Sequence, residues 1–195
     1  SESLEAGVKY LILGALSTGF FVYGMTWIYG ITGDTNLARV AAKLATLQNS
    51  ETAILFAFLL VLVGLGFKVG AVPFHVWIPD VYSGAPTPIT AFLSVASKSA
   101  GFLLAVRVIQ PFLGASPVAA KVALILTVVA GATLLVGNLG ALPQNNLKRL
   151  LAYSSIGHAG YLLMALASSQ TENSPSAFGS SASSIAFYLA GYLAM

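Results

Sequence analysis

Apolar runs of about 20 residues recur along the whole chain, and each is long enough to cross the ~30 Å hydrocarbon core of a bilayer as an α-helix. Of the 195 residues, 57% are hydrophobic and only 8% are charged. An ordinary soluble domain carries roughly a quarter charged residues. The sequence therefore predicts an all-α protein, a polytopic transmembrane helix bundle.

The hydrophobic pattern predicts about six spans within a single transmembrane domain. They are expected at residues 8–30, 52–83, 88–110, 118–142, 147–168 and 184–195. A polar stretch at about 31–51 and a serine-rich polar loop at 169–184 separate some of them. The first residue is not Met and the last span is truncated, so we expect the chain to be an internal fragment of a larger subunit.

Two features of the composition exclude whole classes of function. The chain has no cysteine, which removes disulfides, thiolate metal sites and iron–sulfur ligation. Nine basic and six acidic residues are spread thinly, and without a basic tract we expect no nucleic-acid partner. The residues indicate neither a metal site nor a cofactor site.

The second span combines a lysine with a helix breaker. Lys68 lies in an apolar run, and Pro73 follows it five residues later. Proline lacks a backbone N–H and clashes with the preceding turn, so we expect the span to lose regular helical hydrogen bonding within 68–75 and to resume a helix before Pro86. In lipid, a broken backbone is tolerated only where protein or a watery cavity surrounds it. Lys68 is thus a candidate proton-carrying group beside a hydrated break.

Lys98 is the second candidate, because it lies ~15 Å from each end of its expected span at about 1.5 Å per residue. A charge at that depth costs ~3 kcal/mol on insertion scales and marks an ion pathway by default. The alternative is a structural lysine satisfied by a carboxylate or by backbone carbonyls. We expect Lys68 and Lys98 to line one hydrophilic axis, continued by His158.

Three further residues are possible relays. His158 falls midway along its span, with Ser154 and Tyr161 on the same face, and a neutral imidazole both donates and accepts; the alternative is a histidine hydrogen-bonded to a serine in a helix contact. His75 follows the break and faces either the cavity or the interface. Lys9 is either an interfacial anchor or the mouth of a proton path.

The remaining charged residues near these spans have structural interpretations. Asp80 is expected to be an ion-pair partner or a helix-terminus residue. Lys148 and Arg149 begin a span at the end of the helix dipole that disfavours cations. Lipid phosphate or a partner protein is expected to hold them.

Two blocks carry a family resemblance. The chain reads "GFKVGAVPFHVWIPDVYSGAPTPITAFLSVASKSAGF" and later "NNLKRLLAYSSIGHAGYLL", and it resembles the antiporter-like membrane subunits of bacterial proton-pumping NADH:quinone oxidoreductase, respiratory complex I. The opening "SLEAGVKYLILGALSTGFFVYG" favours the N branch of that family over the L and M branches.

The resemblance implies an antiporter-like fold of two inverted repeats, each with one broken helix. Lys68 matches the central proton-carrying lysine of the first broken helix, and Lys98 matches a lysine of the central hydrophilic axis. Lys9 and His75 match a family lysine and a family histidine. The glutamate that pairs with the lysine of the broken helix would precede residue 1, and the second broken helix would follow Met195.

The resemblance further implies a non-redox translocase subunit without a complete active site of its own. NADH, flavin, iron–sulfur clusters and quinone would belong to partner subunits, and no cofactor would bind this chain. Its partners would be other membrane subunits of complex I, the lipid bilayer, protons and water, in the cell inner (plasma) membrane. The alternatives are a subunit of a free-standing multisubunit cation/proton antiporter and a purely structural helix bundle.

Overall fold

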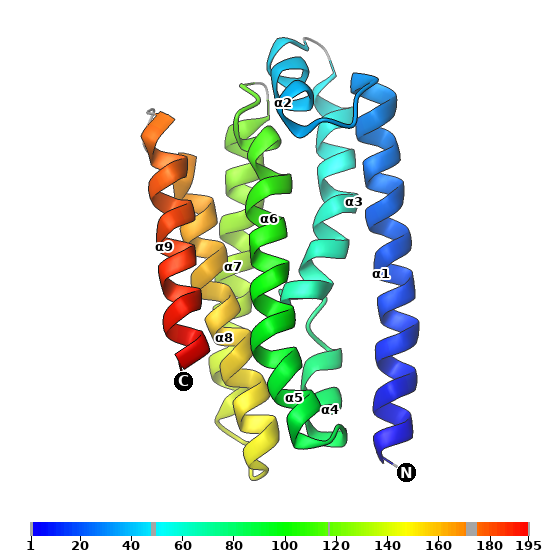
Figure 1. Ribbon diagram of the computed structural model, residues 1–195, viewed down its shortest axis with the longest axis vertical. Coiled ribbons are helices and arrows are strands. Elements are labelled where there is room, and N and C mark those ends of the chain that lie inside the picture. The colour runs from blue at the N-terminus through cyan, green and yellow to red at the C-terminus, as the bar shows by residue number, and fades with distance from the viewer. Residues whose placement is uncertain (1, 48–49, 117, 171–174, 195) are drawn as a thin grey trace.

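The computed structural model describes residues 2–47, 50–116, 118–170 and 175–194. Long helices run side by side along the longest axis of the molecule (Figure 1), and these residues contain no strand. The elements are α1 (Glu2–Thr32), α2 (Leu37–Thr46), α3 (Glu51–Val69), α4 (Trp77–Gly84), α5 (Thr87–Phe92), a π-helical turn (Leu93–Ser97), α6 (Lys98–Leu113), α7 (Ala119–Ala141), α8 (Leu147–Ala167), a 3₁₀ turn (Ser168–Gln170) and α9 (Pro175–Ala194).

Five helical segments of the described residues are long and apolar enough to cross a membrane. They are Ser3–Thr32, Glu51–Val69, Thr87–Leu113, Ala119–Ala141 and Leu147–Ala167. The third combines α5, the π-helical turn and α6. The helix α9, in the place of the sixth expected span, is not among them. The all-α, multi-pass architecture is confirmed.

The predicted break in the second span is present, but Gly70 begins it. Helix α3 ends at Val69 and α4 starts at Trp77. Gly70 has a φ of 80°, a left-handed conformation that glycine adopts without steric cost. Its N–H and that of Ala71 both donate to the Gly66 carbonyl, at 2.9 and 2.8 Å. Pro73 therefore lies inside a break that Gly70 has already opened.

Neighbouring side chains satisfy the backbone groups at the break. The Val72 N–H donates to Thr133 Oγ1 of α7 at 3.0 Å, and Thr133 is fully buried. The indole Nε1 of Trp77 donates to the carbonyl of Phe67 at 3.0 Å. Protein thus covers the first part of the break, where Gly70 and Ala71 are buried, whereas Pro73 and Val76 are exposed. Burial in protein is one condition under which irregular backbone is tolerated at membrane depth.

Two stretches outside the expected spans contain helices. The first is α2, which lies across one end of the bundle (Figure 1). It buries Val40 and Leu44 and exposes Arg39. The side chain of Asn36 caps α2 by accepting from the N–H groups of Ala38 and Arg39.

The second is the serine-rich stretch 169–184, which was expected to be a loop. Helix α9 already begins at Pro175. The hydroxyls of Ser183 and Ser184 donate to the Ser180 carbonyl, so these polar groups are satisfied by the helix itself. Residues 171–174 of the expected loop lie outside the described residues.

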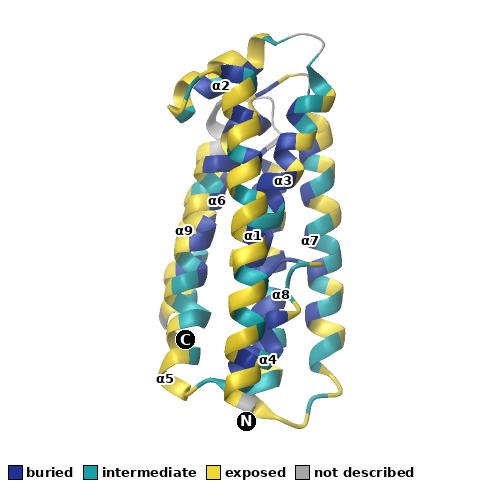
Figure 2. Ribbon diagram, turned by 90° about the vertical axis from the view of Figure 1, so that its right-hand side faces the viewer, coloured by how far each residue is buried: buried dark blue, intermediate teal, exposed yellow. Residues whose placement is uncertain are grey.

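Small residues bring the central helices together. A Cβ atom on Gly137 of α7 would lie 2.5 Å from the backbone nitrogen of Gly157 of α8. One on Gly160 would lie 2.7 Å from Leu134 Cγ. Such close backbone approach is typical of helix pairs in membranes. Figure 2 shows the buried residues on the inner faces of the helices, while the outer face of α1 is largely exposed.

Candidate functional site

Lys98 lies inside the bundle, at the start of α6 directly after the π-helical turn. Its exposed fraction is 2%. The ammonium nitrogen Nζ donates to both the backbone carbonyl and the hydroxyl of Ser155 on α8, and the exposed fraction of Ser155 is 1%. No carboxylate of the described residues forms an ion pair with Lys98. The lysine is held by neutral oxygen atoms alone.

Lys68 lies in the last turn of α3 and is exposed. It borders a cavity of about 440 Å³ between α1, α3 and α6, to which Ser17, Thr18 and Leu104 also contribute. A Cβ atom on Gly101 of α6 would lie 3.0 Å from Lys68 Cγ. Within the described part of the chain, the side chain of Lys68 forms no ion pair and no hydrogen bond.

Lys68 therefore packs against α6 about one helical turn away from Lys98. Gly101, against which Lys68 packs, lies three residues after Lys98 and thus one turn along the helix. The two lysines differ in surroundings, because Lys68 opens onto the cavity whereas Lys98 is enclosed. Their common role in proton transfer remains a prediction.

His158 contacts α9 rather than the polar residues of its own helix. Its Nδ1 atom lies 2.6 Å from the hydroxyl oxygen of Tyr188, and its ring lies 5.0 Å from the ring of Tyr192. The hydrogen bond that the structure gives His158 is thus to a tyrosine and not to a serine, and Tyr161 is exposed. Tyr192 also donates to the Ser155 hydroxyl at 3.1 Å, so the residue next to His158 reaches the partner of Lys98.

Ser155, Tyr188 and Tyr192 were not among the predicted site residues. Ser155 precedes His158 by three residues, so the two share a helix face, and this spacing was the available signal. The tyrosines come from α9, and both fall within the expected span 184–195. Their contacts with α8 span 30 and 37 residues, which no local spacing reveals.

His75 and Lys9 lie apart from this cluster. His75 is half-buried within the break, and its Nδ1 atom is buried. No hydrogen bond joins it to Lys68 or Lys98. Lys9 lies near the N-terminal end of α1 and bonds to acidic side chains there.

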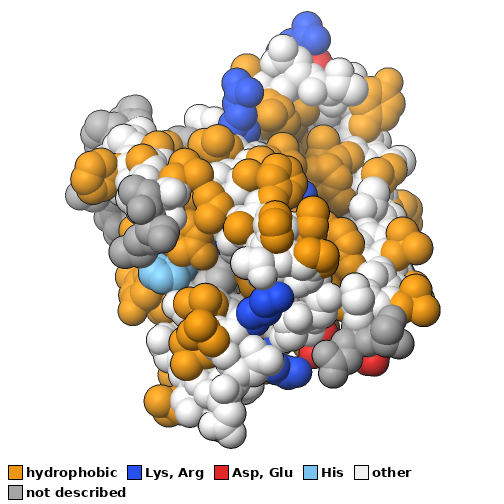
Figure 3. Space-filling view, turned by 60° about the horizontal axis from the view of Figure 1, so that its bottom comes forward, with side chains coloured by type: hydrophobic (Ala, Val, Ile, Leu, Met, Phe, Trp, Pro, Cys, Tyr) orange, Lys and Arg blue, Asp and Glu red, His pale blue; other side chains and the backbone are white. Residues whose placement is uncertain are grey.

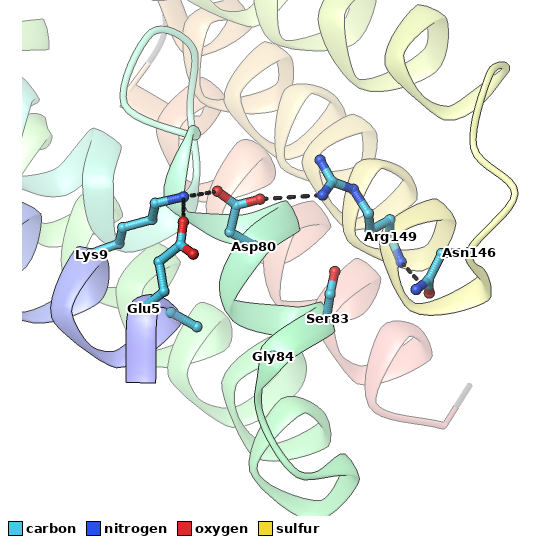
Figure 4. A pocket seen from close by; sticks show the side chains of 8 residues that line it. Glu5, Lys9, Asp80, Ser83, Gly84, Asn146 and Arg149 are labelled. Carbon is cyan, nitrogen blue, oxygen red and sulfur yellow. Dashed lines mark hydrogen bonds and ion pairs between the residues drawn. The ribbon is translucent and has the colours of Figure 1, made fainter. Parts of the chain in front are cut away.

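Basic and acidic side chains lie close together at one end of the bundle (Figure 3), and an ion-pair network surrounds Lys9 (Figure 4). Lys9 Nζ is 2.7 Å from Glu5 Oε1 and 2.8 Å from Asp80 Oδ2. Arg149 Nη1 is 3.3 Å from Asp80 Oδ1. A cavity of about 250 Å³ lies among these side chains. The expectation that Asp80 is an ion-pair partner is confirmed.

The expectation that lipid phosphate or a partner protein holds Lys148 and Arg149 needs correction. Arg149 pairs with Asp80, and Lys148 Nζ donates to the backbone carbonyl of Ala85 at 3.0 Å. Because Ala85 ends α4, the start of α8 contacts both the first turn and the end of α4.

A second set of charges lies at the opposite end of the bundle. Asp34 Oδ2 is 2.8 Å from Arg39 Nε and 3.6 Å from Lys43 Nζ. The backbone N–H of Asn36 and the neighbouring guanidinium of Arg39 hold the pKa of the Asp34 carboxyl below its ordinary value. Among the described residues, no group of three or more histidine, cysteine or acidic side chains is placed to hold a metal ion.

Comparison with known proteins gives a consistent result. Residues 1–193 match the family model described as NADH:quinone oxidoreductase/Mrp antiporter, TM. The NADH-quinone oxidoreductase subunit N of Trichlorobacter lovleyi is 46% identical over 195 residues, which cover 100% of this chain and 38% of the relative. The chain thus spans well under half the length of this relative.

Three solved structures share the fold. An archaeal membrane-bound sulfane sulfur reductase matches with a TM-score of 0.85 and 31% identity, over 98% of this chain and 37% of the other. Respiratory complex I from Thermus thermophilus matches with a TM-score of 0.71 and 39% sequence identity, over 96% of this chain and 39% of the other. The Mrp complex from Dietzia matches with a TM-score of 0.77 and 26% sequence identity, over 97% of this chain and 33% of the other.

The family model covers nearly the whole chain, and the helices that carry Lys68, Lys98 and His158 all lie within the match. The chain belongs to the NADH:quinone oxidoreductase/Mrp antiporter transmembrane family.

Proposed function

We propose that this chain forms part of a proton-translocating membrane subunit of an NADH:quinone oxidoreductase. The relative from Trichlorobacter lovleyi carries the name of subunit N of that enzyme. The Thermus complex I chain is also more similar in sequence than the Mrp chain, at 39% against 26% identity. Sequence similarity thus favours the oxidoreductase over a free-standing antiporter.

The observation that carries this proposal is the burial of Lys98 in the middle of a membrane span. Its exposed fraction is 2%, and it lies 11 residues from the start of the 27-residue segment Thr87–Leu113. Burial disfavours the charged form of an amine, and without a carboxylate nearby no opposite charge offsets that cost. A change in nearby charge can therefore make Lys98 take up or release a proton, and intramembrane lysines in this setting mark proton relays.

Lys68 is the second proton-carrying group of the proposal. It lies beside the broken helix and opens onto a cavity that includes hydroxyl groups of Ser17 and Thr18. Water in this cavity connects the Lys68 amine with the membrane surface. His158 extends the path on the other side of Lys98, while His75 and Lys9 are further relay positions.

The redox chemistry of this proposal takes place in partner subunits. NADH, flavin, iron–sulfur clusters and quinone bind there, and this chain binds none of them. Its own partners are the other membrane subunits, the lipid bilayer, protons and water, in the inner membrane of a bacterial cell. Electron transfer in those subunits changes the charge near Lys68 and Lys98, and the two lysines take up or release protons in response.

The test replaces Lys68 in the full-length subunit within the intact complex. Lys68→Ala removes the titratable amine, so proton pumping driven by NADH oxidation falls about a hundredfold while the complex still assembles. Lys68→Arg fails almost as badly, because a guanidinium does not release its proton at accessible pH. Pumping is measured with a pH-gradient dye in reconstituted vesicles.

Lys121→Ala is the matched control, because Lys121 pairs with Glu51 near one end of the bundle. It pumps at the wild-type rate. If Lys68→Arg also pumped at the wild-type rate, Lys68 would serve the fold alone and the proposal would fail at this residue.

A further inference from the structure

Lys98 lies at the end of a chain of hydroxyl groups that reaches a different helix. Its Nζ atom contacts the hydroxyl of Ser155 on α8, and the hydroxyl of Tyr192 on α9 donates to the same Ser155 oxygen at 3.1 Å. Lys98 and Ser155 are buried, whereas Tyr192 is only half-buried. The chain of polar groups thus runs from the enclosed amine toward a less enclosed position.

The packing of α8 against α9 places a tyrosine hydroxyl against a polar side chain of α8 at two positions, one turn apart. Ser155 and His158 lie one turn apart on α8, and Tyr192 and Tyr188 lie one turn apart on α9. Tyr192 meets Ser155, and Tyr188 meets His158 at 2.6 Å. Ser155 and His158 of α8 therefore each have a tyrosine hydroxyl of α9 as a partner.

We propose that the hydroxyl groups of Ser155 and Tyr192 form a proton wire that loads and unloads Lys98 from the α9 side of the bundle. This inference rests on the proposed function, since it names the residues by which protons reach one of its lysines. A hydroxyl group both donates and accepts, so a chain of two hydroxyls conducts a proton in either direction.

The loading step balances in atoms and charge. A hydronium ion at Tyr192 gives a proton to the phenolic oxygen and becomes water. The former phenolic proton passes to the Ser155 oxygen, and the former Ser155 proton passes to the lone pair of the neutral Lys98 amine. Three bonds to hydrogen break and three form, and the positive charge arrives on Lys98. Unloading is the reverse sequence.

A merely structural role for these hydroxyls predicts a different pattern. Lys98 bonds to the Ser155 hydroxyl and carbonyl but not to Tyr192. If the hydroxyls only held Lys98 in place, removal of the Ser155 hydroxyl would affect pumping and removal of the Tyr192 hydroxyl would not. The wire requires both.

The experiment compares Tyr192→Phe and Ser155→Ala with Lys98→Ala in the full-length subunit within the intact complex. Tyr192→Phe keeps the ring and removes one oxygen atom, so complex content is expected to stay at the wild-type level. The initial rate of proton pumping in vesicles, normalised to complex content, is expected to fall about tenfold or more in both hydroxyl variants. Tyr23→Phe removes an exposed hydroxyl from α1, and Ser154→Ala removes the neighbouring serine hydroxyl; both pump normally.

The outcomes separate the wire from the proposed function. Wild-type pumping by Tyr192→Phe, with pumping lost in Lys98→Ala, overturns the wire and leaves the proposed function standing. Wild-type pumping by Lys98→Ala overturns the role of Lys98 itself and the wire with it. If Ser155→Ala does not assemble, Tyr192→Phe decides alone, since a tenfold loss supports the wire and no loss overturns it.

Discussion

Asp80 is the residue through which three helices are joined by charge. Its two carboxylate oxygens lie 2.8 Å from Lys9 of α1 and 3.3 Å from Arg149 of α8. Asp80 itself lies in the first turn of α4, so the short helix after the break is held from both sides (Figure 4). The side chains are partly exposed, at 33% for Asp80 and 42% for Lys9, and each pair therefore contributes about 1 kcal/mol or less.

A double-mutant cycle tests this network. Lys9→Gln and Asp80→Asn each lower the free energy of unfolding by about 1 kcal/mol or less. The double variant loses less than the sum of the two, because both changes remove the same ion pair. Thermal unfolding of the full-length subunit measures the losses. Lys121→Gln at the other end of the bundle is the control, and its effect adds to that of Asp80→Asn. Strict additivity of Lys9→Gln with Asp80→Asn would contradict the network.

At the scale of the helices, the break between α3 and α4 depends on one glycine, Gly70. Gly70 adopts a φ of 80°, and a Cβ atom there would lie 2.2 Å from Ile78 Cδ1 of α4. Gly33 also has a positive φ, 66°, but nothing lies within 4 Å of its Cβ position. Both glycines have a positive φ, but only the Cβ position of Gly70 is occupied by a neighbouring side chain.

This difference gives a matched pair of variants. Gly33→Ala loses about 1 kcal/mol of stability through the positive φ alone. Gly70→Ala loses a further ~1–3 kcal/mol, because Ile78 has to move away from a packed position. The midpoints of thermal unfolding of the two variants measure the gap. Equal midpoints would mean that α4 is not packed against the end of α3.

The elements differ in how far the sequence predicts them. The membrane spans, including Glu51–Val69, are predictable because a span requires a long continuous run of apolar residues. Helix α2 does not stand out in the sequence because it is short and buries only Val40 and Leu44, within the polar stretch at about 31–51. The start of α9 was missed because serine is common in loops, although its hydroxyl can bond within a helix.

At the scale of the whole molecule, charge is separated by depth. The ion pairs lie at the two ends of the bundle, around Asp80 and around Asp34, whereas Lys68 and Lys98 lie between them. On α7 four large apolar residues are exposed: Leu124, Val128, Leu135 and Leu139. This distribution fits a bilayer that covers the middle of the helices and leaves both ends in water.

The sequence predicts the titratable residues of the candidate site but not the residues that form hydrogen bonds with them. Lys68, Lys98 and His158 stand out because charged and imidazole side chains are costly in a membrane span. Their partners are ordinary serine and tyrosine residues, which carry no such cost and gain a role only when α8 and α9 pack together. The bond between Lys98 and Ser155 joins residues 57 positions apart, beyond the reach of any local pattern.

The central claim is that a buried, titratable amine moves protons, and Lys98→Gln tests it most directly. Arg107→Gln is the control, because Arg107 is an exposed cation on the same helix, nine residues later. Both variants are made in the full-length subunit, and the intact complexes are compared in vesicles for protons pumped during NADH oxidation. The account predicts that Lys98→Gln lowers the pumping rate about a hundredfold at unchanged complex content, while Arg107→Gln pumps normally. Wild-type pumping by Lys98→Gln would contradict it.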